Sequence, residues 1–109
     1  MQTIVPVGSF EGKARDLLTD AEFDAMIELI ARRPKVGRVV QGTGGLRKVR
    51  IARIGGGKSG GARVIYYHHG DGNPILLLLI YAKADQENLK TGQKLALKKL
   101  VEEIIHQFG

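Results

Sequence analysis

The longest apolar run of the chain, "ILLLLIYA" at residues 75–82, constrains the fold more than any other feature. It is far shorter than the ~20 residues that a membrane-spanning helix needs. A short apolar run that follows a turn such as "GDGNP" is typical of a strand buried on both faces. We therefore predict a strand over Ile75–Lys83 with both of its faces covered.

Residues 46–54 show the alternation of a half-buried strand. Val49 and Ile51 point to one face in this pattern, and Lys48 and Arg50 point to the other. The pattern predicts a strand with one apolar and one cationic face.

Two more segments favour strands. Residues 62–69, "ARVIYYHH", are rich in β-forming side chains. With the strands on either side and short connections, they predict a three-stranded antiparallel meander. Residues 3–7, "TIVPV", fit a short edge strand, because Pro6 cannot donate a hydrogen bond to a ladder.

Helical patterns flank these strands. Thr19 and Glu22 have the spacing of a capping box at the start of a helix that ends before Pro34, and residues 11–18 add a short helix before it. From Thr91 onward one apolar stripe recurs at helical spacing, made by Leu97, Leu100, Val101, Ile104, Ile105 and Phe108. The fold class is therefore α+β: a small antiparallel sheet, an N-terminal helical pair and a C-terminal helix packed on the sheet.

Length and composition point to an ordinary globular protein. The chain has 109 residues, which suits one domain over residues 1–109. It has no cysteine, so it has neither disulfides nor thiolate ligands for a metal. Its first residues lack the pattern of a signal peptide. We expect a soluble, cytoplasmic protein with no membrane partner.

Positive charge is concentrated in the middle of the chain. The net charge is +6, yet no acidic residue occurs between Glu28 and Asp71. That interval contains Arg32, Arg33, Lys35, Arg38, Arg47, Lys48, Arg50, Arg53, Lys58 and Arg63. Such segregation predicts a partner that supplies negative charge, with nucleic acid ahead of an anionic membrane. The alternative is a solvated positive face without a dedicated partner.

Several common chemistries do not fit these residues. His68 and His69 are neighbours on a strand, so they point to opposite faces and cannot chelate one metal ion; we expect them at the surface. Ser9 and Ser59 lack the setting of a nucleophile. The stretch "GGGKSGG" lies between strands and has Ala52 where a phosphate-binding loop would need its first glycine. We expect a hairpin tip that presents Lys58, and no metal or cofactor.

The remaining pattern is one of cations with interleaved tyrosines. Lysine and arginine bind phosphates, and tyrosine rings can stack on unpaired bases. RNA can be cut by attack of its own 2′-OH on the adjacent phosphorus, and fixed cations would stabilise the charge that develops. For any single tyrosine, a half-buried strand position is the competing interpretation.

Two stretches of the chain carry a family resemblance: "QGTGGLRKVRIARIGGGKSGGARVIYY" and "LLLLIYAKADQENLKTGQKLALKKLVEEI". In their order and motifs they resemble the RelE/HigB toxins of type II toxin–antitoxin systems, and specifically the HigB-like branch. The resemblance implies a RelE/ParE-like fold and a ribosome-dependent endoribonuclease, or mRNA interferase, that cleaves messenger RNA in the ribosomal A site and inhibits translation. It also implies a cognate antitoxin with a helix-turn-helix domain.

The resemblance assigns roles by position. Arg63 matches the family's strand arginine, which contacts the scissile phosphate. Lys48 and Arg50 match the paired cations of the preceding strand, and Lys83 matches the basic residue that closes the last strand. We expect these four as catalytic residues, and we expect RNA contacts from Lys58, Arg47, Tyr66 and Tyr81.

One departure from the family leaves the general base open. The RelE branch often has a tyrosine after the last strand, where this chain has Asp85, Gln86, Asn88 and Leu89. The candidates for the base are then Lys48 and Tyr81. Two other functions also remain: a ParE-type toxin that acts on DNA gyrase without nuclease activity, and a non-catalytic nucleic-acid-binding module.

Overall fold

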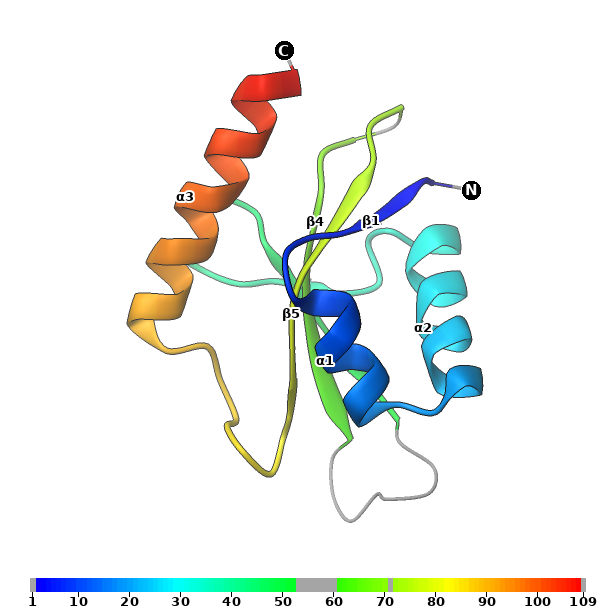
Figure 1. The fold of residues 1–109 in the computed structure, drawn as a ribbon. Helices are drawn as coiled ribbons and strands as arrows, with labels where there is room; N and C mark the ends of the chain where they lie inside the picture. Colours follow the sequence, from blue (N-terminus) through cyan, green and yellow to red (C-terminus); the bar gives the residue numbers. More distant parts are fainter. Residues whose placement is uncertain (1, 53–60, 71, 109) are drawn as a thin grey trace.

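A mixed sheet with helices on both faces forms the molecule (Figure 1). The computed structural model describes residues 2–52, 61–70 and 72–108. The strands are β1 (Ile4–Pro6), β2 (Arg38–Val39), β3 (Arg47–Ile51), β4 (Ala62–His68) and β5 (Ile75–Ala82), and the helices are α1 (Phe10–Leu17), α2 (Asp20–Arg32) and α3 (Thr91–Phe108). The strand order is β1-β5-β4-β3-β2, which confirms the α+β class. None of the helices described is long and apolar enough to cross a bilayer.

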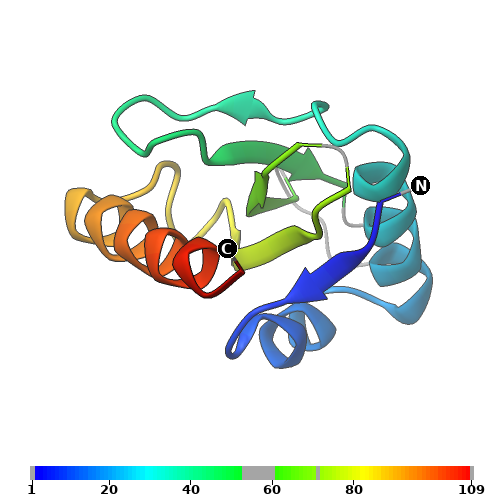
Figure 2. The ribbon, with the colours of Figure 1, turned by 90° about the horizontal axis from the view of Figure 1, so that it is seen from above.

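Each face of the sheet has its own apolar core. Figure 2 shows α3 on one side of the sheet and α2 on the other. The core on the α1/α2 side includes Phe10, Met26, Ile30, Val64 and Tyr66. The core on the α3 side consists of Leu46, Ile65, Leu76, Leu78, Tyr81, Leu89 and Val101, with Leu97, Leu100, Ile104 and Ile105 packed against it. We call these two sides of the sheet the α1/α2 face and the α3 face.

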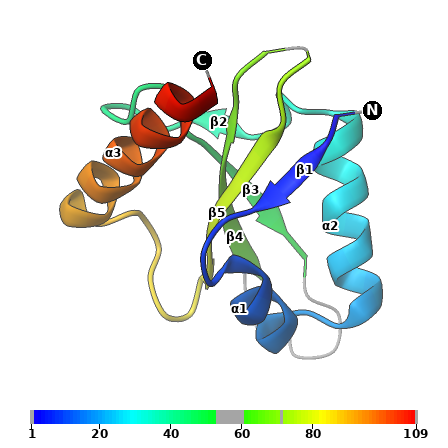
Figure 3. The same cartoon turned by 45° about the horizontal axis from the view of Figure 1, so that its top comes forward.

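The predicted meander is confirmed, and two features of the sheet go beyond it. β3, β4 and β5 pair antiparallel as expected. β1 is an edge strand, but it pairs with β5 in parallel. β2, which pairs with β3, was not predicted, because two residues are too few to show a period. The helical pair carries the chain from the β1 edge to the β2 edge (Figure 3).

The interior strand β5 contains an irregularity that changes the face to which its later side chains point. Ile65 of β4 lies opposite Leu79, but the next residue, Tyr66, lies opposite Leu77, so Leu78 is the extra residue of a bulge. A one-residue shift moves all later side chains of a strand to the other face. Tyr81 therefore belongs to the α3 face, whereas uninterrupted alternation from Leu77 would place it on the α1/α2 face.

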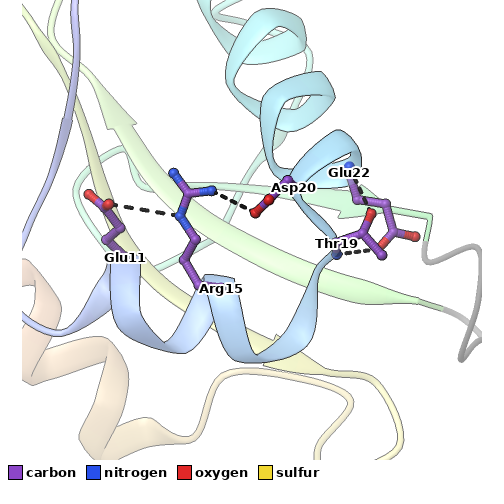
Figure 4. A network of polar contacts seen from close by, with 5 residues as sticks. All are labelled: Glu11, Arg15, Thr19, Asp20 and Glu22. Carbon is purple, nitrogen blue, oxygen red and sulfur yellow. Dashed lines mark hydrogen bonds and ion pairs between the residues drawn. The ribbon is translucent and has the colours of Figure 1, made fainter.

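The start of α2 is fixed by the predicted capping box (Figure 4). The Glu22 amide donates to Thr19 Oγ1 at 3.1 Å, and the Thr19 amide donates to Glu22 Oε1 at 2.8 Å. Arg15 of α1 reaches Asp20 at 3.1 Å and lies 3.9 Å above the ring of Phe23. These contacts hold the two helices at a fixed angle over the sheet.

Replacement of Thr19 by alanine should lower the free energy of unfolding by ~1 kcal/mol, because the Glu22 amide loses its acceptor. Urea denaturation followed by circular dichroism measures the change. Ser9 is a matched control, since it precedes α1 as its N-cap without a side-chain cap hydrogen bond. An equal loss from Ser9→Ala and Thr19→Ala would contradict the role of the capping box.

Candidate nucleic-acid interface

Two of the predicted catalytic residues and one predicted RNA-binding residue form a row across three strands. Arg50 of β3 lies opposite Arg63 of β4, and Arg63 lies opposite Tyr81 of β5. Side chains opposite each other on antiparallel strands point to the same face, with Cβ atoms about 5 Å apart. Because Ile65 and Tyr81 belong to the α3 core, this is the α3 face of the sheet. Two arginines and a phenol are thus aligned at one end of this face.

Lys48 adds a third cation to the same face. It lies two residues before Arg50, so its side chain points in the same direction. Its Nζ donates to Oδ1 of Asn88 at 3.2 Å, which ties β3 to the loop between β5 and α3. Among the described residues, no ion pair includes Lys48 or Arg50; the ion pairs found there involve Arg15 and Arg32 of α1 and α2. The end of the α3 face is therefore cationic.

Lys83 lies near the same end of the sheet. It follows Ala82, the last residue of β5, and its amide donates to the carbonyl of Gly61 at 3.1 Å. Ala82 lies opposite Ala62, in the register position next to Tyr81 and Arg63. Lys83 is half-buried and lies where a cation could contact an anion held by the row.

Tyr81 has an unusual environment for a tyrosine hydroxyl. Its side chain is only 7% exposed, and its hydroxyl is shielded from solvent without a hydrogen-bond partner in the described part of the chain. Burial raises the pKa of Tyr81, while the positive charge of Arg63 lowers it by a smaller amount. The hydroxyl therefore keeps its proton at neutral pH, and it is suited to donate a hydrogen bond.

Arg47 does not join this group of cations. It is one residue away from Lys48, so it points to the other face of β3. Its guanidinium donates to the carbonyls of Gly37 at 2.7 Å and Lys35 at 3.4 Å. These contacts hold the segment before β2 in place, and they give Arg47 a structural role instead of the expected contact with RNA.

The expectation that Tyr66 contacts RNA is wrong for a similar reason. Its side chain is 0% exposed and belongs to the core on the α1/α2 face. Its hydroxyl donates to the carbonyl of Pro34 at 2.7 Å and accepts from the amide of Gly37 at 2.8 Å. A ring in this position cannot stack on a base.

Three other positions in the sequence predictions are Lys58, His68 and His69. Lys58 lies outside the described residues, so its predicted contact with RNA stays a prediction. His68 and His69 do differ in their surroundings, as alternation requires: His69 is exposed, but His68 is half-buried, contrary to the expectation of two surface histidines. Within the described ranges, no cluster of three potential metal ligands occurs.

Sequence reasoning missed how the loop after β5 is organised. Asn88 contacts Lys48, and Gln86 donates to the carbonyl of Asn88 at 3.1 Å and to the side chain of Gln93 at 3.0 Å. Gln93 in turn accepts from the amide of Lys90 at 3.0 Å, just before α3 begins. The polar run "ADQEN" was the available signal, but no spacing rule links it to β3.

The fold and the cationic face define a small α+β protein with a surface suited to phosphate. The family model that matches residues 9–107 is described as "RelE toxin of RelE / RelB toxin-antitoxin system". The chain thus belongs to the RelE toxin family. It is a RelE-like toxin, and the family implies a RelB-type antitoxin as its partner.

Removal of the Tyr66 hydroxyl should test its structural role. Tyr66→Phe leaves the Gly37 amide and the Pro34 carbonyl without their partner, and we expect a loss of ~1–3 kcal/mol in the free energy of unfolding. Urea denaturation provides the measurement. The control is Tyr67→Phe, whose hydroxyl makes only an exposed contact with His69 at 3.3 Å and should cost less than ~0.5 kcal/mol. A Tyr66→Phe variant as stable as its control would refute the assignment.

Alkaline pH should destabilise the protein through its buried tyrosines. Burial raises the pKa of both Tyr66 and Tyr81 above the ordinary value in the folded chain. As the pH rises, the tyrosines of the unfolded chain therefore lose their protons before those of the folded chain. The contribution of these two tyrosines to the free energy of unfolding is fully present below pH ~10 and decreases as the pH rises above it. Thermal denaturation against pH, with phenolate absorbance, measures the effect. Tyr81→Phe should weaken the pH dependence, and an unchanged dependence in this variant would contradict the burial of its hydroxyl.

Proposed function

We propose that this toxin is a ribosome-dependent endoribonuclease that cleaves messenger RNA in the ribosomal A site. The observation that carries the proposal is the alignment of Arg50, Arg63 and Tyr81 across three strands on one face. A scissile phosphate on this face would meet the guanidinium groups of Arg50 and Arg63, and the protonated Tyr81 hydroxyl lies beside them, shielded from solvent. Membership of the RelE family supports the same function.

The proposed reaction needs only groups of the RNA and of this chain. The 2′-oxygen attacks the adjacent phosphorus and loses its proton, the bond from phosphorus to the 5′-oxygen breaks, and that oxygen takes up a proton. The products are a 2′,3′-cyclic phosphate and a 5′-hydroxyl end. Arg63 and Arg50 would stabilise the additional negative charge on the non-bridging oxygens, which is the type of preorganised electrostatic contact that contributes most to catalysis.

The environment of Tyr81 bears on the general base. Tyr81 keeps its proton at neutral pH because burial raises its pKa, so it is a poor base there. Lys48 would accept the 2′-OH proton only in its uncharged form, and in that form it would not act as a cation of the site. Tyr81 would donate a hydrogen bond to the phosphate or to the leaving oxygen only after its ring moved outward, since its hydroxyl is shielded from solvent. Lys83, at the end of β5, would contribute a further positive charge.

The toxin would act in the cytoplasm and would be held inactive there by its antitoxin. We propose an antitoxin with a helix-turn-helix domain, in accord with the HigB-like motifs "GTGGLRK" and "GGARVIYY". Expression of the chain alone should then arrest growth, and co-expression of the antitoxin should restore growth.

Arg63→Ala should lower the rate of message cleavage by ~100-fold, equivalent to ~3 kcal/mol of transition-state stabilisation. The measurement is primer extension on a message translated in vitro, with and without ribosomes. Arg32→Ala is the control, since it also removes one arginine but lies on α2 in an exposed ion pair with Glu28.

Cleavage that requires ribosomes and fails in Arg63→Ala, but persists in Arg32→Ala, would support the proposal. Full activity of a folded Arg63→Ala variant would remove this residue from the site. Growth arrest without any cleavage, together with inhibition of purified DNA gyrase, would replace the proposal with a ParE-type activity.

A further inference from the structure

A rigid turn follows α2 and has its polar backbone groups directed into the protein. Tyr66 donates to the carbonyl of Pro34 and accepts from the amide of Gly37, at 2.7 and 2.8 Å. Arg47 donates to the carbonyls of Gly37 and Lys35, at 2.7 and 3.4 Å. Gly37 fits tightly here, since a Cβ at this position would lie 2.8 Å from the Tyr66 ring. The side chains of Tyr66 and Arg47 thus hold the turn in place through hydrogen bonds to its backbone.

A cavity of about 320 Å³ lies at this turn. Its lining includes Arg33 and Lys35 from the turn and His68 from the end of β4. Nε2 of His68 is shielded from solvent, and no described residue forms a hydrogen bond with it. The cavity is therefore lined by two cations and by His68, whose Nε2 is buried and has no hydrogen-bond partner among the described residues.

The charge around the cavity favours an anion. Arg33 and Lys35 take part in no ion pair among the residues that the structure describes. The carbonyls that could compete with an anion are engaged, since Pro34 and Lys35 accept from Tyr66 and Arg47. The C-terminal end of α2 carries partial negative charge, is nearby and disfavours an anion. This effect is reduced because the Arg33 amide donates to the Leu29 carbonyl at 2.9 Å.

We infer that this turn is a second phosphate-binding site, which contacts an RNA backbone phosphate distinct from the scissile one. A phosphate seated between Arg33 and Lys35 would accept charge-assisted hydrogen bonds from both. Nε2 of His68 would contact the same phosphate only after a rotation of the half-buried ring that exposes this atom. RNA as the source of the phosphate rests on the proposed function; a free phosphate ion has the same chemistry, and the experiment distinguishes the two.

The site is separate from the row of Arg50, Arg63 and Tyr81. His68 pairs with Ile75 and follows Tyr66 by two residues, so it lies on the α1/α2 face, whereas Arg63 lies on the α3 face. His68 and Arg63 are also five residues apart on β4, roughly 17 Å along the strand. A phosphate at this turn would therefore not be the one that is cleaved.

Binding of a fluorescein-labelled single-stranded RNA, measured by anisotropy over a range of salt concentrations, tests the inference. The double variant Arg33→Ala/Lys35→Ala should bind about tenfold more weakly. The slope of log Kd against log salt should decrease by about 0.7, the value for one phosphate of a single strand. The control Lys13→Ala/Arg32→Ala removes the same charge from exposed positions outside the cavity and should change neither quantity.

His68 adds a test that charge alone does not provide. His68→Gln keeps an N–H donor and should bind RNA like the wild type, whereas His68→Leu should bind more weakly. Titration of the wild type with RNA should shift the NMR signals of the His68 ring and the Gly37 amide. Equal RNA binding by all these variants, or an equal loss in the Lys13→Ala/Arg32→Ala control, would overturn the inference.

Inorganic phosphate separates the two possible sources. Inorganic phosphate is titrated while the same NMR signals are observed. If phosphate shifts these signals and added RNA does not displace the phosphate, the turn is a small-anion site and its role in RNA binding is overturned. If the wild type cleaves message but Arg33→Ala/Lys35→Ala binds RNA as tightly as the wild type, the second phosphate site is rejected and the proposed nuclease is retained. RNA binding through the turn without any cleavage would instead reject the proposed nuclease and leave the site in place.

Discussion

The bulge at Leu78 in β5 is the constraint on which the cationic face depends. β5 is an interior strand with both faces buried, so an extra residue there decides which core each later side chain enters. It places both Leu78 and Leu79 on the α3 side and brings Tyr81 beside Arg63. Without it, the phenol would point into the core with Val64 and would not lie beside Arg63. A packing irregularity in the core thus sets the composition of the surface site.

Much of the fold could be predicted because several of its signals are local. The capping box of Thr19 and Glu22, the helical stripe of α3 and the alternation around Val49 each depend on residues within a few positions. The bulge and β2 have no such signal. A run of leucines looks the same with or without an extra residue, and a two-residue strand exists only through its pairing with β3.

The candidate site was predicted in part, and the errors have one cause. Strand alternation correctly places Lys48 and Arg50 on the face of β3 opposite to Val49. The predicted RNA contacts of Arg47 and Tyr66 did not follow this alternation. Arg47 lies an odd number of residues from both Lys48 and Arg50, so it had to face the other side of β3. Tyr66 lies three residues after Arg63 on β4, so the same rule places it on the face opposite to Arg63. Its partners Pro34 and Gly37 had no signal, because they are about thirty residues away in the sequence.

The positions of the two proposed phosphate sites offer a physical reason for the dependence on the ribosome that we propose. Lys48, Arg50 and Arg63 point to the α3 face, whereas Arg33 and Lys35 lie beyond α2 on the opposite side of the sheet. Under the two proposals, one free RNA strand would have to wrap around an edge of the sheet to reach both. Several RNA strands that enclose the protein could occupy both sites at once, and simultaneous contacts on one rigid body reinforce each other. Free messenger RNA would seldom occupy both sites at the same time, so it would bind more weakly than RNA in the ribosome and would seldom present its 2′-OH in line with the phosphate.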